Sequence, residues 1–189
     1  MRIKYNSPVI LTFTLLSFFI MTLSSFFGNW LTLTFFAIPG SLDYTNPLTY
    51  LRLFTHIIGH ADWNHFISNF SLLLLLGPLL EEKYGSKLIL FMIVLTALST
   101  GILNAIFFHN GILGASGIVF MLILMSSFTD FEAGEIPLTF ILVSTLFFGK
   151  ELISSFGDDK ISQFAHMLGG ISGSLFGFIY HRKGKHFLD

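Results

Sequence analysis

Long apolar runs constrain this chain more than any other feature. The first extends from about Pro8 to Phe27 without a charged residue, and it is long enough to cross a hydrocarbon core of about 30 Å. Hydrophobic residues make up 53% of the 189 residues and charged residues only 11%, which lies far outside the usual composition of soluble domains. The sequence therefore predicts an all-α membrane protein.

Six apolar runs can be separated by charged clusters and by turn residues such as Gly85 and Pro137. We expect a single domain over residues 1–189 with six spans, at about 8–27, 64–80, 87–108, 114–129, 137–153 and 161–180. A long connection from Gly28 to Thr55 follows the first span, and its part Trp30 to Ile38 is apolar enough to lie in the membrane interface.

The distribution of basic residues predicts the orientation. An even number of spans puts both termini on one side, and seven of the ten Lys and Arg residues fall there. They are Arg2, Lys4, Lys83, Lys87, Arg182, Lys183 and Lys185. The positive-inside rule then favours a multi-pass protein with both termini cytoplasmic, and we expect its membrane to be a prokaryotic cytoplasmic membrane. A signal peptide is the alternative for the first run, but that run is long and lacks a small-residue cleavage site.

Composition excludes several classes of function. The formal net charge is -1 and the basic residues are scattered, so no nucleic-acid partner is expected. The absence of cysteine removes disulfides, thiolate metal sites and cysteine nucleophiles. The seven histidines therefore carry most of the unusual chemistry.

The stretch Gly114-Ala115-Ser116-Gly117 places a serine at the start of the fourth span. Ser116 is fourteen residues before Asp130, or about 21 Å along a helix, so it should lie below the outer surface. Gly111 and Gly114 give the preceding turn the freedom to enter the membrane. A helix N-terminus also favours a developing oxyanion. Taken alone, however, the motif is more often a helix contact through small residues.

A polar stretch, residues 56–69, lies at the outer end of the second span. His65 and Asn69 are four residues apart and project from one helix face. Each can donate a hydrogen bond, and polar groups inside a membrane usually serve a site. We interpret residues 62–64 as helix capping and interfacial packing.

His56 and His60 precede that helix, and we expect them to hold the loop and the helix end by hydrogen bonds. Their spacing of four residues also suits a zinc site, so a metal-dependent membrane protein is an alternative. No His-Glu-x-x-His motif is present, and we expect neither a metal nor another cofactor.

The third stretch surrounds His166 in the sixth span. Gly169, Gly173 and Gly177 form a stripe of small residues that lets two helices approach closely. Close approach of the fourth and sixth spans would let neutral His166 take the proton of Ser116 and return it to a leaving amine.

Taken together, the ordered motifs resemble the rhomboid family of intramembrane serine proteases. The matching residues are His60, His65 and Asn69, then Gly114, Ser116 and Gly117, then His166, Gly169 and Gly173. The resemblance covers about residues 8–181 and implies a six-helix bundle whose first loop is partly embedded in the membrane. It implies a catalytic Ser116–His166 dyad, with the oxyanion held by the Ser116 N–H, His65 and Asn69.

The resemblance also implies what such an enzyme acts on. Its partners would be the lipid bilayer and single-pass membrane proteins, cut near the outer membrane face, and residues 137–160 would gate their entry. Non-catalytic relatives that only bind membrane helices lose the serine or the histidine, and this chain retains both.

Two positions depart from the family pattern. The Trp-Arg pair of the first loop reads Leu51-Arg52 here, which leaves the anchoring of that loop open. Four residues after the serine, where many members have a tyrosine beneath the catalytic histidine, this chain has Phe120. Ring packing should survive without the hydroxyl contact, so we expect altered pKa or stability of His166 rather than inactivity.

Overall fold

The computed structural model describes residues 3–107, 111–127, 135–154 and 160–184. Within these ranges the chain is helical, apart from an isolated β-bridge between Ile38 and Ile112. The helices are α1 (Pro8–Phe27), α2 (Trp30–Phe35), α3 (Pro47–Thr55), α4 (Trp63–Tyr84), α5 (Ser86–Phe107), α6 (Ser116–Ser126), α7 (Leu138–Ser154) and α8 (Lys160–Gly184).

By length and composition, three helices in the described ranges could cross a membrane, namely α1, α4 and α5. The helix α6 and the segment Ala165–Ile179 of α8 are shorter apolar helices. An all-helical apolar bundle is therefore confirmed, whereas the count of six spans stays a prediction. Residue 108 of the third predicted span and residues 128–129 of the fourth lie outside the described ranges, as do Arg2, Lys185 and part of the predicted gate.

Several helix ends differ from the predicted limits, and for two of them the physical reason is clear. The helix α4 continues to Tyr84, past the predicted end at residue 80, because charged residues end an apolar run without ending the backbone helix. The helix α6 begins at Ser116 rather than at Gly114, since Gly114 has a φ of 118° that a right-handed helix does not adopt.

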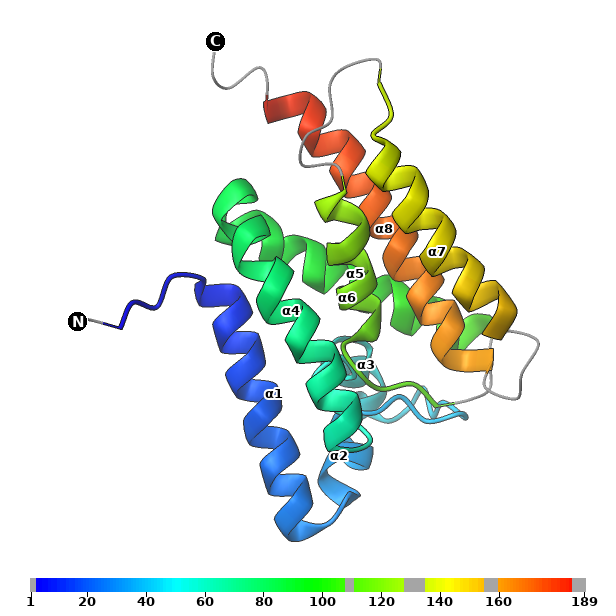
Figure 1. Cartoon of the computed structure of the whole chain (residues 1–189). Coiled ribbons are helices and arrows are strands. Elements are labelled where there is room, and N and C mark those ends of the chain that lie inside the picture. The colour runs from blue at the N-terminus through cyan, green and yellow to red at the C-terminus, as the bar shows by residue number, and fades with distance from the viewer. Residues whose placement is uncertain (1–2, 108–110, 128–134, 155–159, 185–189) are drawn as a thin grey trace.

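The centre of the bundle is α6, which contacts α4, α5, α7 and α8 (Figure 1). Every residue from Gly117 to Met125 is buried. The helices α6 and α8 lie so close that a Cβ atom on Gly169 would overlap the carbonyl of Gly117, and one on Gly173 would overlap that of Met121. The predicted close approach through the glycine stripe is thus confirmed, and both helices run in the same direction.

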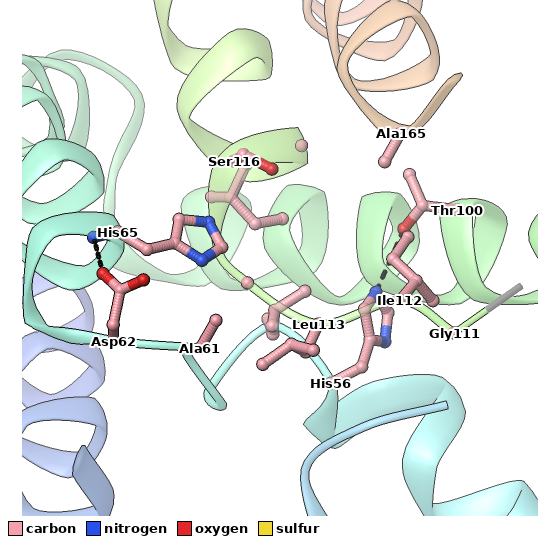
Figure 2. A pocket seen from close by; sticks show the side chains of 14 residues that line it. His56, Ala61, Asp62, His65, Thr100, Gly111, Ile112, Leu113, Ser116 and Ala165 are labelled. Carbon is pink, nitrogen blue, oxygen red and sulfur yellow. Dashed lines mark hydrogen bonds between the residues drawn. The ribbon is translucent and has the colours of Figure 1, made fainter. Parts of the chain in front are cut away.

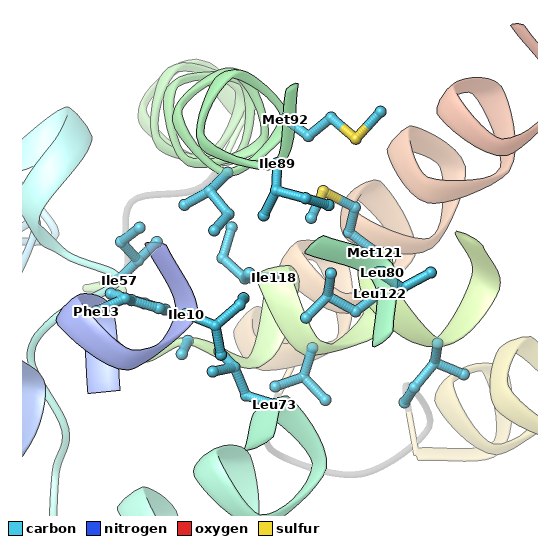
Figure 3. Close-up of a cluster of buried hydrophobic side chains, with 14 of the residues drawn as sticks. Ile10, Phe13, Ile57, Leu73, Leu80, Ile89, Met92, Ile118, Met121 and Leu122 are labelled. Carbon is cyan, nitrogen blue, oxygen red and sulfur yellow. The ribbon is translucent and has the colours of Figure 1, made fainter. Parts of the chain in front are cut away.

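The apolar core joins four helices around α6. Figure 3 shows Ile10 of α1, Leu73 of α4, Met92 of α5 and Ile118 of α6 meeting there, all with essentially no exposed surface. Next to this core, the buried carboxylate of Glu81 accepts hydrogen bonds from the N–H groups of Val9 and Ile10, each at 3.0 Å. The end of α4 therefore caps the start of α1.

The helices α2 and α3 form the first connection and lie at one end of the bundle, near the start of α6 (Figure 1). Arg52 Nε donates to the carbonyl of Thr34 at 2.7 Å, and Thr55 Oγ1 donates to that of Phe35 at 2.5 Å. Both bonds satisfy carbonyls at the C-terminal end of α2. Arg52 thus anchors the connection, while Leu51 is 46% exposed.

Candidate active site

The turn that precedes Ser116 is attached to the first connection by backbone hydrogen bonds. Ile38 and Ile112 exchange two N–H···O bonds of 2.9 Å, and Gly114 N–H donates to the carbonyl of His56 at 2.9 Å. Ala115 N–H donates to His60 Nε2 at 3.3 Å. The position of the serine is therefore determined by a segment far away in the sequence.

Glycine is required at position 114 for two reasons. Its φ of 118° lies in a region that other residues rarely adopt, and a Cβ there would lie 2.6 Å from His65 Cε1. At Gly111 the structure bears on space rather than on backbone conformation, so its predicted contribution of backbone freedom stays a prediction. A Cβ at Gly111 would lie 3.1 Å from the carbonyl oxygen of Ile38, so its small size serves the close approach at the β-bridge.

Ser116 lies at the N-terminus of α6 and lines a cavity of about 380 Å³. Figure 2 shows the His65 ring extending from α4 toward the start of α6, where Ser116 is located. The wall also includes Gly114 and Gly117, with Ala165 contributed by α8. The first N–H groups of a helix point toward such an opening with the positive end of the helix dipole, which favours an anion beside Ser116.

Capping and cavity roles overlap around His65, because Asp62 both caps α4 and lines the cavity. Asp62 is the N-cap of α4, and its carboxylate accepts the His65 N–H at 2.8 Å. Trp63 Nε1 donates to Ser25 Oγ of α1 at 3.0 Å. The ring of His65 packs edge-on against that of His60, with centroids 5.0 Å apart.

His56 and His60 hold the loop, as the sequence predicted. His60 Nδ1–H donates to the carbonyl of Ile58 at 3.1 Å, and its Nε2 accepts from Ala115, which fixes one neutral tautomer. His56 Nδ1 bonds the carbonyl of Arg52 at 3.1 Å, and Nε2 lies 3.4 Å from Thr100 Oγ1. Burial lowers the pKa of His56 to about 4. Burial and then the neighbouring His65 lower the pKa of His60 to about 4.

These hydrogen bonds bear on the metal alternative. Both ring nitrogens of His56 and of His60 already face partners inside the protein. No group of three or more His, Asp or Glu side chains arranged to hold a metal ion occurs in the described ranges. The ring nitrogens of His56 and His60 are thus engaged within the protein.

Asn69 lies one turn beyond His65 on α4 and is only 6% exposed. In the part of the chain that the structure describes, its Nδ2 atom has no hydrogen-bond partner. Asn69 does not line the cavity itself. A buried donor without a partner is costly to the folded state.

His166 lies against α6 rather than in the cavity wall. Its ring stacks on that of Phe120, with centroids 4.4 Å apart and an interplanar angle of 7°. Phe120 is four residues after Ser116 and so lies one turn further along the same helix face. The preceding residue, Ala165, lines the cavity. The expected ring packing between residues 120 and 166 is confirmed.

Two residues that shape this region were missed. Thr100 of α5 lines the cavity and faces His56; a hydroxyl within an apolar span was the available signal. Gly59 is buried, and a Cβ there would overlap the carbonyl oxygen of Phe36. A glycine between two histidines of the polar stretch gave no sign of that contact.

Comparisons with known proteins agree with this architecture. The family model described as the Rhomboid domain matches residues 47–183. The chain is similar to RHOMBOID-like protein 1 of Arabidopsis thaliana, with 30% identity over 139 residues, covering 68% of this chain and 34% of that protein. The chain thus spans about a third of the length of this relative.

Proposed function

Because the chain belongs to the rhomboid family and is an integral membrane protein, we propose that it is an intramembrane serine endopeptidase. It hydrolyses peptide bonds of single-pass membrane proteins near the outer membrane face. Rhomboid proteins are usually serine proteases that act on membrane proteins in the bilayer. The substrates and the activity of this chain are our proposal.

In the proposed mechanism, Ser116 Oγ attacks the scissile carbonyl while neutral His166 takes the proton and later gives it to the leaving amine. The Ser116 N–H, His65 and Asn69 hold the oxyanion. The chemistry needs no metal or other cofactor. His56 and His60 are supporting residues that position the serine turn, and Gly114, Gly117, Gly169 and Gly173 permit the close approaches that the site requires.

For the whole chain we propose one domain with six spans and a first connection partly embedded in the membrane. The starts of α4, α6 and α8 lie at the end of the bundle that carries α2 and α3, whereas the start of α1 and the end of α8 lie away from it (Figure 1). This arrangement supports both termini on one side. The basic residues favour the cytoplasmic side for both termini, and residues 137–160 gate substrate entry.

One observation carries the proposal. Ser116 begins a buried helix at a cavity of about 380 Å³ that the His65 ring also lines. A small-residue helix contact requires neither this cavity nor a neighbouring histidine, so the contact alone does not account for the serine. The stacking of His166 on Phe120 supports its assignment as the base.

The decisive experiment is cleavage of a single-pass reporter in proteoliposomes by the wild type, Ser116→Ala and His166→Ala, each with and without a chelator. Loss of a member of a serine–histidine pair removes most of the rate acceleration, by about 10⁴-fold or more. We expect no measurable cleavage by either variant, unchanged melting temperatures and no effect of the chelator.

Other outcomes would select the alternatives. Cleavage that survives Ser116→Ala, or that disappears with the chelator, would overturn the dyad in favour of metal-dependent chemistry. Failure of the wild type to cleave any of several reporters while still binding their membrane helices would favour a catalytically silent rhomboid relative.

A further inference from the structure

A second cavity, of about 500 Å³, opens between α1, α5 and the end of the first connection. Its floor is formed by Phe13, Ile57 and Ile93, which are 9%, 7% and 4% exposed. Figure 3 shows Phe13 and Ile57 together at one edge of the core. The rim side chains are much more exposed, and they are Leu16, Phe54, Leu90 and Val94. We call this cavity the α1–α5 groove.

The groove opens toward the bilayer. Both α1 and α5 are long and apolar enough to span a membrane, so the exposed rim between them is continuous with the lipid-facing surface. Among the described residues that line the groove, two carry a hydroxyl group, Thr12 and Thr55. Thr12 Oγ1 is bonded to Tyr5 at 3.0 Å, and Thr55 Oγ1 to the carbonyl of Phe35. An apolar occupant would therefore leave neither of these hydroxyl groups without a hydrogen-bond partner.

The size of the groove distinguishes between apolar occupants. A helix is about 10 Å wide and rises about 5.4 Å per turn, so one turn fills about 420 Å³. The groove of about 500 Å³ would hold little more than one helical turn, so it is too small to bind a membrane helix along its length. A single acyl chain is thin and flexible, and most of the side chains that line the groove are apolar.

A basic residue lies one helical turn before Leu90, which lines the groove. Lys87 precedes Leu90 and Val94 by three and seven residues on α5, so the three share one helix face. Lys87 is exposed and lies in the first turn of α5. A phosphate at the membrane surface would lie within reach of this ammonium group while its acyl chain follows the rim inward.

The groove and the candidate catalytic cavity share one wall residue. Ile57 lines both cavities, and it directly follows His56, whose carbonyl accepts the Gly114 N–H. Interiors are close-packed, so the support behind Ile57 affects the serine turn.

We propose that the α1–α5 groove binds one acyl chain of an anionic phospholipid, with its phosphate near Lys87, and that this chain supports Ile57 against the catalytic cavity. The lipid site stands without the proposed protease activity. Its effect on the catalytic cavity rests on that activity.

The test uses the full chain exchanged into palmitoyl-oleoyl phosphatidylglycerol, with retained lipid counted by native mass spectrometry. Val94→Trp fills the rim of the groove, and Leu95→Trp is its matched control, because Leu95 is exposed on α5 but does not line the groove. We expect Val94→Trp to reduce lipid retention at least five-fold, and Leu95→Trp to retain lipid like the wild type. Lys87→Gln should reduce the preference for phosphatidylglycerol over phosphatidylcholine several-fold.

A second readout is the rate at which a fluorophosphonate labels Ser116. We expect Val94→Trp to slow labelling at least three-fold, with Leu95→Trp unchanged. Equal lipid retention by both tryptophan variants would overturn the site, as would crosslinking of a substrate helix in place of lipid to a photoreactive residue at position 94. Absence of labelling in the wild type would count against the protease and leave the lipid result standing.

Discussion

The two ends of α4 treat a buried polar side chain in opposite ways. Near the start of the helix, Asn69 is 6% exposed, and within the described ranges its Nδ2 has no acceptor. Near the other end, Glu81 is 3% exposed, and each carboxylate oxygen accepts one backbone N–H of α1. Both groups give up solvation when buried, but only Glu81 is fully compensated inside the fold.

Under the proposed function, this difference separates a structural polar group, Glu81, from one that serves the active site, Asn69. The hydrogen bonds of Glu81 join α4 to α1, so the burial of this carboxylate is explained by its contribution to stability. The burial of the Asn69 amide has no such compensation, and the amide lies one turn from His65, which lines the cavity beside Ser116. In the proposed mechanism, a donor that has no partner in the folded chain is preorganised to stabilise the negative charge that develops in the transition state. Substitutions at the two ends should therefore affect different properties.

Asn69→Ala should have the largest effect in this comparison, and the effect should be on rate. Loss of one oxyanion donor typically costs about 10²- to 10³-fold, whereas removal of an unpartnered amide should change the free energy of unfolding by less than about 1 kcal/mol. Reporter cleavage and thermal melting would measure both quantities. The control is Ser68→Ala, since Ser68 is exposed and bonds only within its helix. Cleavage within two-fold of the wild type would remove Asn69 from the site.

Glu81→Gln should show the reverse pattern. The neutral amide keeps one acceptor and turns an N–H toward the second backbone donor, so we expect a loss of about 1.5–3 kcal/mol in stability. Activity per folded molecule should be unchanged. Glu82→Gln, at the exposed neighbour, should leave stability unaltered. A loss of specific activity without a loss of stability would contradict the structural role of Glu81.

Low pH should destabilise the fold through the buried histidines near the serine turn. His60 has a pKa lowered to about 4 by burial and by His65, with Asp62 acting in the other direction, against about 6.5 for an unfolded histidine. The unfolded chain therefore binds protons first as the pH falls, and stability that is complete above pH 6.5 declines toward pH 4. Protonated His60 also loses the acceptor that holds Ala115.

Melting temperatures and cleavage rates at pH 7 and pH 5 would measure this dependence. His60→Gln retains an acceptor but does not titrate, so its melting temperature should fall less between the two values than that of the wild type. His56 is buried and shifted in the same direction, so part of the dependence should remain. A wild-type melting temperature independent of pH from 7 to 4.5 would contradict the assignment.

The sequence predicted features that carry a local signature. Apolar runs located the helices, and the spacing of Gly169 and Gly173 predicted the contact between α6 and α8. The attachment of the serine turn was not predictable, because the bridge between Ile38 and Ile112 uses backbone atoms that any residue possesses. The sequence did not identify Thr100 as a cavity residue for a different reason. Its hydroxyl also bonds the carbonyl of Thr96 at 2.8 Å, and such intrahelical bonds are available to any threonine in a membrane helix.

The smallest expected effect concerns the ring beneath His166. Phe120→Leu removes the stacked pair of rings. Aromatic pairs contribute about 0.5–1.5 kcal/mol beyond their burial, so we expect the free energy of unfolding to fall by about that amount. The cleavage rate should fall by less than about ten-fold. Phe120→Tyr is the matched control, since it keeps the ring and adds a hydroxyl, and its rate should stay within about two-fold of the wild type. Equal losses in both variants would show that the space around position 120, rather than the stacked ring, supports His166. A loss confined to Phe120→Leu would instead show that the stacked ring itself supports His166, one turn along α6 from Ser116. The residues proposed to serve catalysis would then include Phe120 as the residue that orients the base.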